Sequence, residues 1–243
     1  MRICMSFLVR GTVPVHYNYL IQSAIYHRLP TRLSRALHNK GVVEGPRRFK
    51  MFTFSRLYGD FTRSDEGLVY RDRAYLCFSS PLERVVMEVY RSFLRDPVLR
   101  LGGSELNLEV MNVVEPPELG SKTVVYTLSP IAVYRKSEVG TRYYSPYEKE
   151  WELLISLNSL RKYHALRRRY LKTGLVVRPL KAGLSRVKYK DNVVFAWRGE
   201  FEMRGPKSLQ MVVYEAGLGS KNSQGFGMIE VKGRKLRELI SVE

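Results

Sequence analysis

The chain has 243 residues, enough for two domains of ordinary size, and 44% of them are hydrophobic, which indicates a folded protein rather than a disordered or fibrous one. Forty-one Lys and Arg against 23 Asp and Glu give a net charge of +18, which favours a polyanionic partner such as nucleic acid. No segment approaches the roughly 18 consecutive apolar residues of a membrane span, and the N-terminus does not resemble a signal peptide, so we expect a cytoplasmic protein with no membrane contact.

Hydrophobic periodicity in the first half of the chain predicts the element order βαββαβ. The predicted strands and helices, in chain order, are strand 3–10, helix 17–27 with a short extension to residue 39, strands 49–57 and 74–79, helix 81–96 and strand 106–114. The two cysteines of the chain, Cys4 and Cys77, are too few for a disulfide framework and lack neighbours at zinc-ligand spacing. We therefore expect two buried free thiols.

The second half repeats the same order of elements. It is predicted to contain strand 123–128 running on toward residue 134, helix 147–168, strands 175–180 and 193–203, helix 206–216 and strand 227–231. Two βαββαβ units predict an α+β fold of tandem ferredoxin-like domains, the arrangement that RNA-recognition modules use. Prolines and a glycine at 116–120 place the boundary near residue 120, giving domains 1–120 and 121–243. A single compact domain is the alternative.

The basic residues are concentrated in the second half, where residues 123–243 carry a net charge of +12 against +6 for residues 1–122. Residues 153–190 contain eleven Lys or Arg and no Asp or Glu. Tyrosines are interleaved with these cations, which include Arg167, Arg168, Arg169, Lys188 and Lys190. A solvated helix face followed by a basic strand is the ordinary interpretation. The absence of acidic residues favours phosphate contacts and base stacking instead.

The segment GLGSKNSQGFG at 217–227 follows the last predicted helix. Its glycines permit positive φ and close backbone approach, so amide hydrogens there can hold a phosphate. The residues proposed for this anion site are Gly217, Gly219, Lys221, Asn222, Gly225 and Gly227. The position after a helix and the lack of GKS or GKT exclude dinucleotide and nucleotide loops, so we expect no cofactor. Taken alone, the segment is more simply interpreted as a helix C-terminal cap followed by a loop.

The glycine segment, with GxG, five residues and a second GxG, resembles the C-terminal signature of the CRISPR-associated repeat endoribonucleases, the sixth family of Cas proteins. The helix sequence YNYLIQSAIY, the strand sequence KMFTFS and the segment TLSPIAVYR resemble the same family in the same order. The resemblance implies tandem ferredoxin-like domains. It also implies cleavage of CRISPR precursor RNA within each repeat, without metal, as part of antiviral defence.

Cleavage of RNA without metal uses the neighbouring 2′-OH as nucleophile. The protein must supply a base for it, an acid for the leaving 5′ oxygen and a cation for the phosphorane. An unperturbed imidazole, with a pKa near 6.5, can act as this base, and the chain has four histidines: His16, His27, His38 and His164. Only five Asp residues and no paired acidic motif argue against a metal-dependent nuclease.

The resemblance implies His38 as the base, Tyr26 as the acid and Lys50 as the cation. For a lone histidine at a helix end, a structural or solvent-facing role is otherwise the commoner one. Tyr26 points away from the apolar stripe of its helix, on the side of Tyr19 and Gln22. A tyrosine there can also simply cap the core.

Two ambiguities stay open in this candidate site. The chain has extra residues between His38 and Lys50 compared with the family pattern, so Lys40, Arg47 and Arg48 compete for the role of cation, and Arg47 and Arg48 are also candidate RNA contacts. His27 lies beside Tyr26 and is a candidate for assisting it.

The predicted function is a metal-independent endoribonuclease that produces guide crRNAs with 2′,3′-cyclic phosphate and 5′-OH ends. Its predicted partner is CRISPR repeat RNA, and other CRISPR-associated effector subunits are candidate partners. A non-catalytic CRISPR RNA-binding relative and an unrelated RNA-binding scaffold are the alternatives. The sequence does not decide between a monomer and a homodimer.

Overall fold

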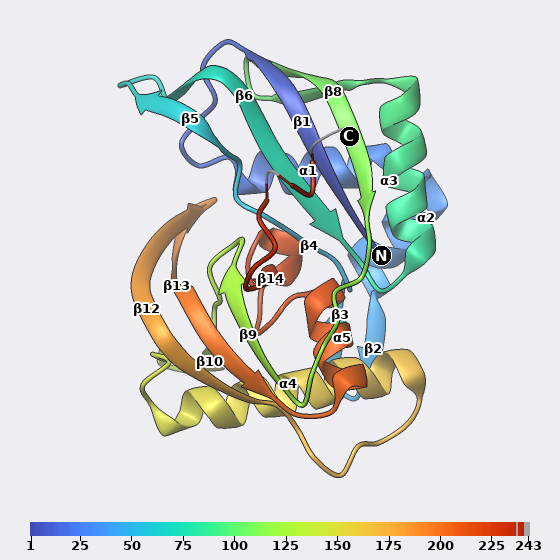
Figure 1. Ribbon diagram of the computed structural model, residues 1–243, viewed down its shortest axis with the longest axis vertical. Coiled ribbons are helices and arrows are strands. Elements are labelled where there is room, and N and C mark those ends of the chain that lie inside the picture. The colour runs from blue at the N-terminus through green and yellow to red at the C-terminus, as the bar shows by residue number, and fades with distance from the viewer. Residues whose placement is uncertain (237, 241–243) are drawn as a thin grey trace.

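The first half of the chain forms an antiparallel sheet covered on one face by helices (Figure 1). The computed structural model describes residues 1–236 and 238–240. The strands of this half are β1 (Arg2–Arg10), β2 (Val42–Glu44), β3 (Arg47–Phe49), β4 (Thr53–Phe54), β5 (Tyr58–Arg63), β6 (Leu68–Ser79), β7 (Val98–Leu101) and β8 (Ser104–Val114). The helices are α1 (Asn18–Arg28), α2 (Thr31–Arg35) with a π-helical turn at Ala36–Lys40, and α3 (Glu83–Arg95).

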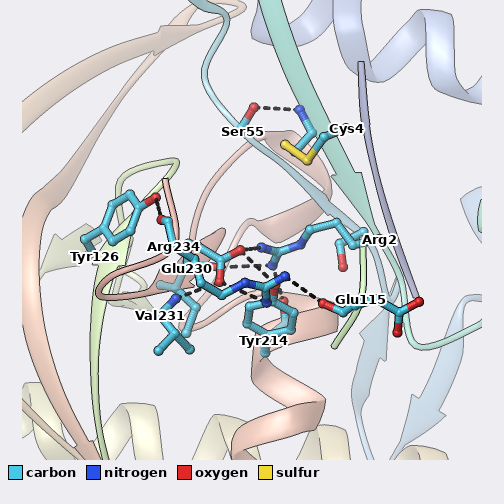
Figure 2. Close-up of polar contacts among 12 residues, drawn as sticks. Arg2, Cys4, Ser55, Glu115, Tyr126, Tyr214, Glu230, Val231 and Arg234 are labelled. Carbon is cyan, nitrogen blue, oxygen red and sulfur yellow. Dashed lines mark hydrogen bonds and ion pairs between the residues drawn. A yellow bond between two sulfur atoms is a disulfide. The ribbon is translucent and has the colours of Figure 1, made fainter. Parts of the chain in front are cut away.

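Alternation along β1 explains how this sheet packs. Ile3, Met5 and Phe7 are buried against the helices, and Phe7 meets Phe93 of α3 at 5.8 Å between ring centroids. Cys4 and its neighbours at every second position face the other side of the sheet. There, Cys4 lies directly opposite Cys77 of β6, and the two form a disulfide (Figure 2). The prediction of free thiols was wrong, because strand register across 73 residues cannot be read from cysteine spacing.

The second half repeats the architecture with its own sheet. Its strands are β9 (Lys122–Thr127), β10 (Tyr134–Ser137), β11 (Gly140–Tyr143), β12 (Val176–Tyr189), β13 (Asn192–Arg204) and β14 (Ile229–Val231). Its helices are α4 (Lys149–Arg167), α5 (Lys207–Ala216) and a short 3₁₀ turn at Asn222–Gln224. Trp151 of α4 stacks on Phe201 of β13 in the core, with ring centroids 6.1 Å apart. The predicted boundary near residue 120 falls between β8 and β9.

The two sheets share one strand order, which confirms the predicted fold class. The neighbours run β4-β6-β1-β8 in the first sheet and β12-β13-β9-β14 in the second, so each unit orders its strands second, third, first, fourth. Several short elements were not predicted, namely β5, β7 and the hairpins β2–β3 and β10–β11. No helix within the described residues has the length and apolarity needed to cross a membrane.

A buried ion pair joins the two halves (Figure 2). Arg2 of β1 donates to the carboxylate of Glu230 in β14 at 2.8 Å, and the two side chains are 1% and 0% exposed. The same guanidinium lies over the ring of Tyr214 and donates to two backbone carbonyls of the second half. The first strand of the chain is therefore anchored in the core between the two sheets.

Candidate active site and RNA-binding surfaces

The last turn of α1 positions Tyr26. Its ring meets that of His38 edge-on, with centroids 5.3 Å apart, and it packs on Phe52 from the other side at 5.6 Å. Burial, and to a smaller extent the nearby Tyr189, raises the pKa of Tyr26 well above its ordinary value. The phenol therefore carries its proton throughout the neutral range, and the same shift makes it a weaker acid than an ordinary tyrosine.

His38 is presented by the π-helical turn that follows α2. The turn ends at Gly41, whose φ of +62° and close approach to the carbonyl of Phe49 exclude a side chain, because a Cβ there would lie 2.6 Å from that oxygen. The imidazole is exposed, and its Nδ1 lies 3.0 Å from Oδ1 of Asn39. In the tautomer whose hydrogen is on Nδ1, Nδ1 donates it to this oxygen, and Nε2 is the nitrogen left to act as a base.

Lys50 completes the group that the sequence predicted. Its ammonium donates a hydrogen bond to the backbone carbonyl of His38. Burial, and next the positive charge of Arg48, lowers the pKa of Lys50. Tyr26, His38 and Lys50 come from three different segments, and the fold brings them together.

Among the residues that compete with Lys50 for the role of cation, Arg47 and Arg48 line the same cavity as Lys50. Lys40 and Arg47 are exposed, and Arg48 donates to the backbone carbonyl of Asn39 at 3.2 Å. The hairpin β2–β3 accounts for extra residues between His38 and Lys50. His27 is exposed, with Nδ1 2.8 Å from the carbonyl of Ser23 one turn earlier in α1.

The remaining two histidines lie outside this cluster. Nδ1 of His164 is 2.6 Å from the carboxylate of Glu44 on β2, and its ring stacks on Tyr170 at 3.8 Å. The pKa of His16 is lowered by burial and then by the positive charge of Lys188. Within the described residues, His38 is the one histidine whose ring packs against Tyr26.

The glycine loop, residues 217–227, is tied into the protein through its own amides. Leu218 donates to Gly227, Ser220 to Ala132, and Gly227 to Pro130, at 2.7 to 2.8 Å. The amides of Gln224, Gly225 and Phe226 close turns on residues 221 and 222. An anion at this loop would therefore meet its side chains, such as Lys221, rather than these amides.

All four predicted loop glycines, Gly217, Gly219, Gly225 and Gly227, adopt positive φ. Asn222 is inside the loop, where Nδ2 donates to the carbonyls of Leu218 and Phe226. Lys221 is half-buried with its ammonium 4.8 Å from the ring centroid of Tyr134. Its pKa is lowered by burial and then by Lys136.

The basic residues predicted for RNA binding fall in two places. Lys188 and Lys190 are exposed at the tip of the β12–β13 ribbon, where Lys190 lies over the ring of Tyr19 on α1 at 4.3 Å. Arg167, Arg168 and Arg169 are exposed at the C-terminal end of α4. The hairpin β2–β3, which carries Arg47 and Arg48, lies against that helix (Figure 1). The contact includes Glu44 of β2 and His164 of the helix.

A large cleft between the two sheets was not predicted. It has a volume of about 990 Å³ and is lined by cations and aromatic rings, among them Arg56, Tyr58, Phe61, Lys181, Arg186 and Arg198. Lys181 and Arg186 belong to the basic run that the sequence showed, but were not singled out within it. Alternation along β12 does not pick them out, because Lys181 and Arg186 are five residues apart and Arg186 has the same parity as Lys188.

Comparison with known proteins identifies the family. Residues 12–112 match the family model described as CRISPR-associated protein Cas6, N-terminal, and residues 114–231 match the model described as CRISPR associated protein Cas6, C-terminal. The chain is 29% identical to the CRISPR-associated endoribonuclease Cas6 of Pyrococcus furiosus, a match that covers 92% of this chain and 85% of that protein. It is 28% identical to the CRISPR-associated endoribonuclease Cas6 1 of Methanocaldococcus jannaschii, over 93% and 91%.

Solved structures agree with these matches. A structure described as CRISPR associated protein Cas6 superposes with a TM-score of 0.78 at 27% identity, covering 95% of this chain and 98% of that one. A structure of a Cas6-related protein from Pyrococcus furiosus shares the fold with a TM-score of 0.84 at 20% identity, over 97% and 99%. The resemblance stated from the sequence is confirmed, and this chain belongs to the Cas6 family of CRISPR-associated proteins.

Proposed function

We propose that this protein is an endoribonuclease that cuts CRISPR repeat RNA in the precursor transcript to release guide RNAs. The observation that carries this proposal is the meeting of Tyr26, His38 and Lys50 at one surface point. Relatives that align over more than nine-tenths of this chain bear the name CRISPR-associated endoribonuclease. Because the substrate is a transcript, a cytoplasmic location is part of the proposal.

The chemistry follows from the three side chains. Nε2 of His38 takes the proton of the 2′-OH, and the 2′ oxygen attacks the phosphorus while the bond to the 5′ oxygen breaks. Tyr26 gives its proton to that leaving oxygen, and the ammonium of Lys50 stabilises the negative charge on the phosphorane. The products are a 2′,3′-cyclic phosphate and a 5′-OH, and no water or metal enters the balance of this step.

The cleft between the sheets supplies a binding surface for the rest of the repeat. Its aromatic rings can stack on unpaired bases, and its arginines can contact phosphates. The exposed basic residues at the end of α4 and at the tip of the β12–β13 ribbon are further candidate phosphate contacts. We include Arg56, Lys181, Arg186 and Arg198 with the RNA contacts predicted from the sequence.

The test is cleavage of synthetic CRISPR repeat RNA in EDTA by the wild-type protein, by His38→Ala and by the matched control His27→Ala. A second substrate carries a 2′-deoxy nucleotide before the cut. We expect cleavage by the wild type and by His27→Ala, and none by His38→Ala or with the deoxy substrate. Binding without cleavage by the wild type would refute the enzymatic assignment and favour a non-catalytic guide-RNA protein.

A further inference from the structure

Lys162 of α4 is a fully buried ammonium with three hydrogen-bond acceptors. Its side chain is 2% exposed, and Nζ donates to the carbonyls of Gly217 and Gly219 at 2.6 and 2.8 Å and to Oδ1 of Asn222 at 2.7 Å. Within the described part of the chain, no carboxylate forms an ion pair with it. A buried charge without a counter-ion is costly, so its retention calls for a role.

The charged form fits this environment better than the neutral one. Burial lowers the pKa of Lys162 to about 7. Three acceptors surround Nζ, however, and a neutral amine has only two hydrogens to donate, so deprotonation would leave one acceptor unpaired. The arrangement is therefore built for an ammonium.

The glycines of the loop are needed to form this arrangement. Gly217 and Gly219 have φ values of +90° and +71°. A Cβ at Gly217 would lie 2.5 Å from Nδ2 of Asn222, and one at Gly219 would lie 2.7 Å from the carbonyl of Ala132. Only glycine lets the chain wrap closely enough to turn both carbonyls onto the lysine.

The same loop borders the candidate catalytic site. Residues 220–223 line a cavity of about 210 Å³ together with Lys50, Arg47, Arg48 and Lys162 itself, and none of its lining residues is acidic. The loop is also bonded to the elements that carry the catalytic side chains. Asn18 of α1 donates to the carbonyl of Gln224 at 2.8 Å, and Thr53 of β4 donates to that of Phe226 at 3.0 Å.

We propose that Lys162 is a positioning residue for RNA cleavage, because its ammonium fixes the glycine loop as a rigid wall of the cavity that contains Lys50. The inference rests on the proposed function. Through Asn18 and Thr53, the loop sets the place of α1, which carries Tyr26, and of the strand that follows Lys50. A displacement of about 1 Å at a reacting group can lower a rate by roughly 10²-fold.

The test compares Lys162→Met, which keeps the length of the stem and removes the charge, with Lys149→Met. Lys149 is exposed on the same helix, about 20 Å away at 1.5 Å per residue. Three quantities are measured: amide hydrogen exchange in residues 217–227, the single-turnover rate at saturating protein, and the affinity for a 2′-deoxy repeat RNA. Lys162→Gln, which keeps two N–H donors, replaces Lys162→Met if circular dichroism shows that the latter is unfolded.

We expect Lys162→Met to lose exchange protection in the loop and to cut about 10²-fold more slowly, with a smaller loss of affinity. Lys149→Met should match the wild type in all three quantities. Unchanged protection in Lys162→Met would overturn the inference, as would lost protection with an unchanged rate. A wild-type protein that cuts no repeat RNA would instead overturn the proposed function together with the catalytic part of the inference, and the exchange data would still show whether Lys162 holds the loop.

Discussion

The ion pair between Arg2 and Glu230 offers a direct test of how the two halves are held together. Replacing Arg2 by Met leaves a carboxylate that is 0% exposed, whose remaining partners include the hydroxyl of Tyr214 and the amide of Val231, each at 2.8 Å, and the guanidinium of Arg234 at 3.5 Å. Removing one partner of a buried pair costs about 3–5 kcal/mol. In a chain of this size each kcal/mol lowers the melting temperature by about 2–4 °C, so we expect a decrease of roughly 6–20 °C.

The assay is thermal unfolding of Arg2→Met, Glu230→Gln and the double variant. Because neutral Gln no longer carries a buried charge, the double variant should be less destabilised than the sum of the two single variants. Strictly additive effects, or a decrease below about 2 °C for Arg2→Met, would refute the idea that the pair is coupled and anchors β1 to β14. Arg73→Ala is the matched control, since its pair with Glu109 is exposed on the same sheet and contributes little.

Three further predictions concern catalysis and RNA binding. His38→Ala should lower the single-turnover rate by about 10²- to 10⁴-fold while the affinity for a 2′-deoxy repeat stays unchanged; a wild-type rate in this variant would eliminate His38 as the base. The cleavage rate should fall at an alkaline pH below 10.5, because burial and Arg48 lower the pKa of Lys50 whereas the pKa of Tyr26 is raised. Lys50→Arg should move this fall in rate to higher pH. An unchanged pH profile in this variant would assign the fall to a group other than Lys50. Arg198→Ala should reduce the dependence of log affinity on log salt by about 0.7, as expected for one lost contact with single-stranded RNA, and an unchanged slope would place the RNA outside the cleft.

Long, regular elements of the fold were predictable, and short or non-local ones were not. The alternation of hydrophobic and polar residues predicted the bounds of β1 and β8 to within a few residues. The buried valines of α3 show the spacing of an amphipathic helix. The hairpins β2–β3 and β10–β11 have strands of three or four residues, too short for a period to be recognised. The pairing of Cys4 with Cys77 depends on the register of β1 against β6, which local sequence does not encode.

The candidate catalytic residues were identified from the resemblance to a family, and the structure shows that the fold brings them together. Neither periodicity nor composition distinguishes His38 from His27, but the structure separates them, with one against the ring of Tyr26 and the other against the backbone of its own helix. The side of α1 on which Tyr26 lies was predictable from helical geometry. Tyr19 and Gln22 contact the β12–β13 ribbon, whereas Tyr26, on the same side of the helix, is partly buried and packs on Phe52 of the core.

Lys162 was counted in the sequence only as one member of a basic run, although helical geometry already marked it. At 100° per residue it lies within about 20° of Trp151 and on the same face as Ile155, both of which are fully buried. A lysine on the apolar stripe of a helix must either reach the surface or find acceptors inside. Counting charge along the chain treats buried and exposed cations alike, which is why the run was assigned wholly to RNA contact.

The glycine loop and the buried lysine act as one electrostatic unit. A glycine-rich loop that binds phosphate through its backbone presents its amides outward. Here the loop's amides donate to carbonyls within the protein, as at Leu218, Ser220 and Gly227, and two loop carbonyls accept hydrogen bonds from Lys162. The loop therefore encloses a positive charge that, among the described residues, has no carboxylate partner and lies in a region of low dielectric. Such a charge is weakly screened by solvent and adds to the potential of Lys50 and Lys221 at the cavity they share. On this basis we expect the loop to attract the RNA backbone through the lysine that it surrounds as well as through its own side chains.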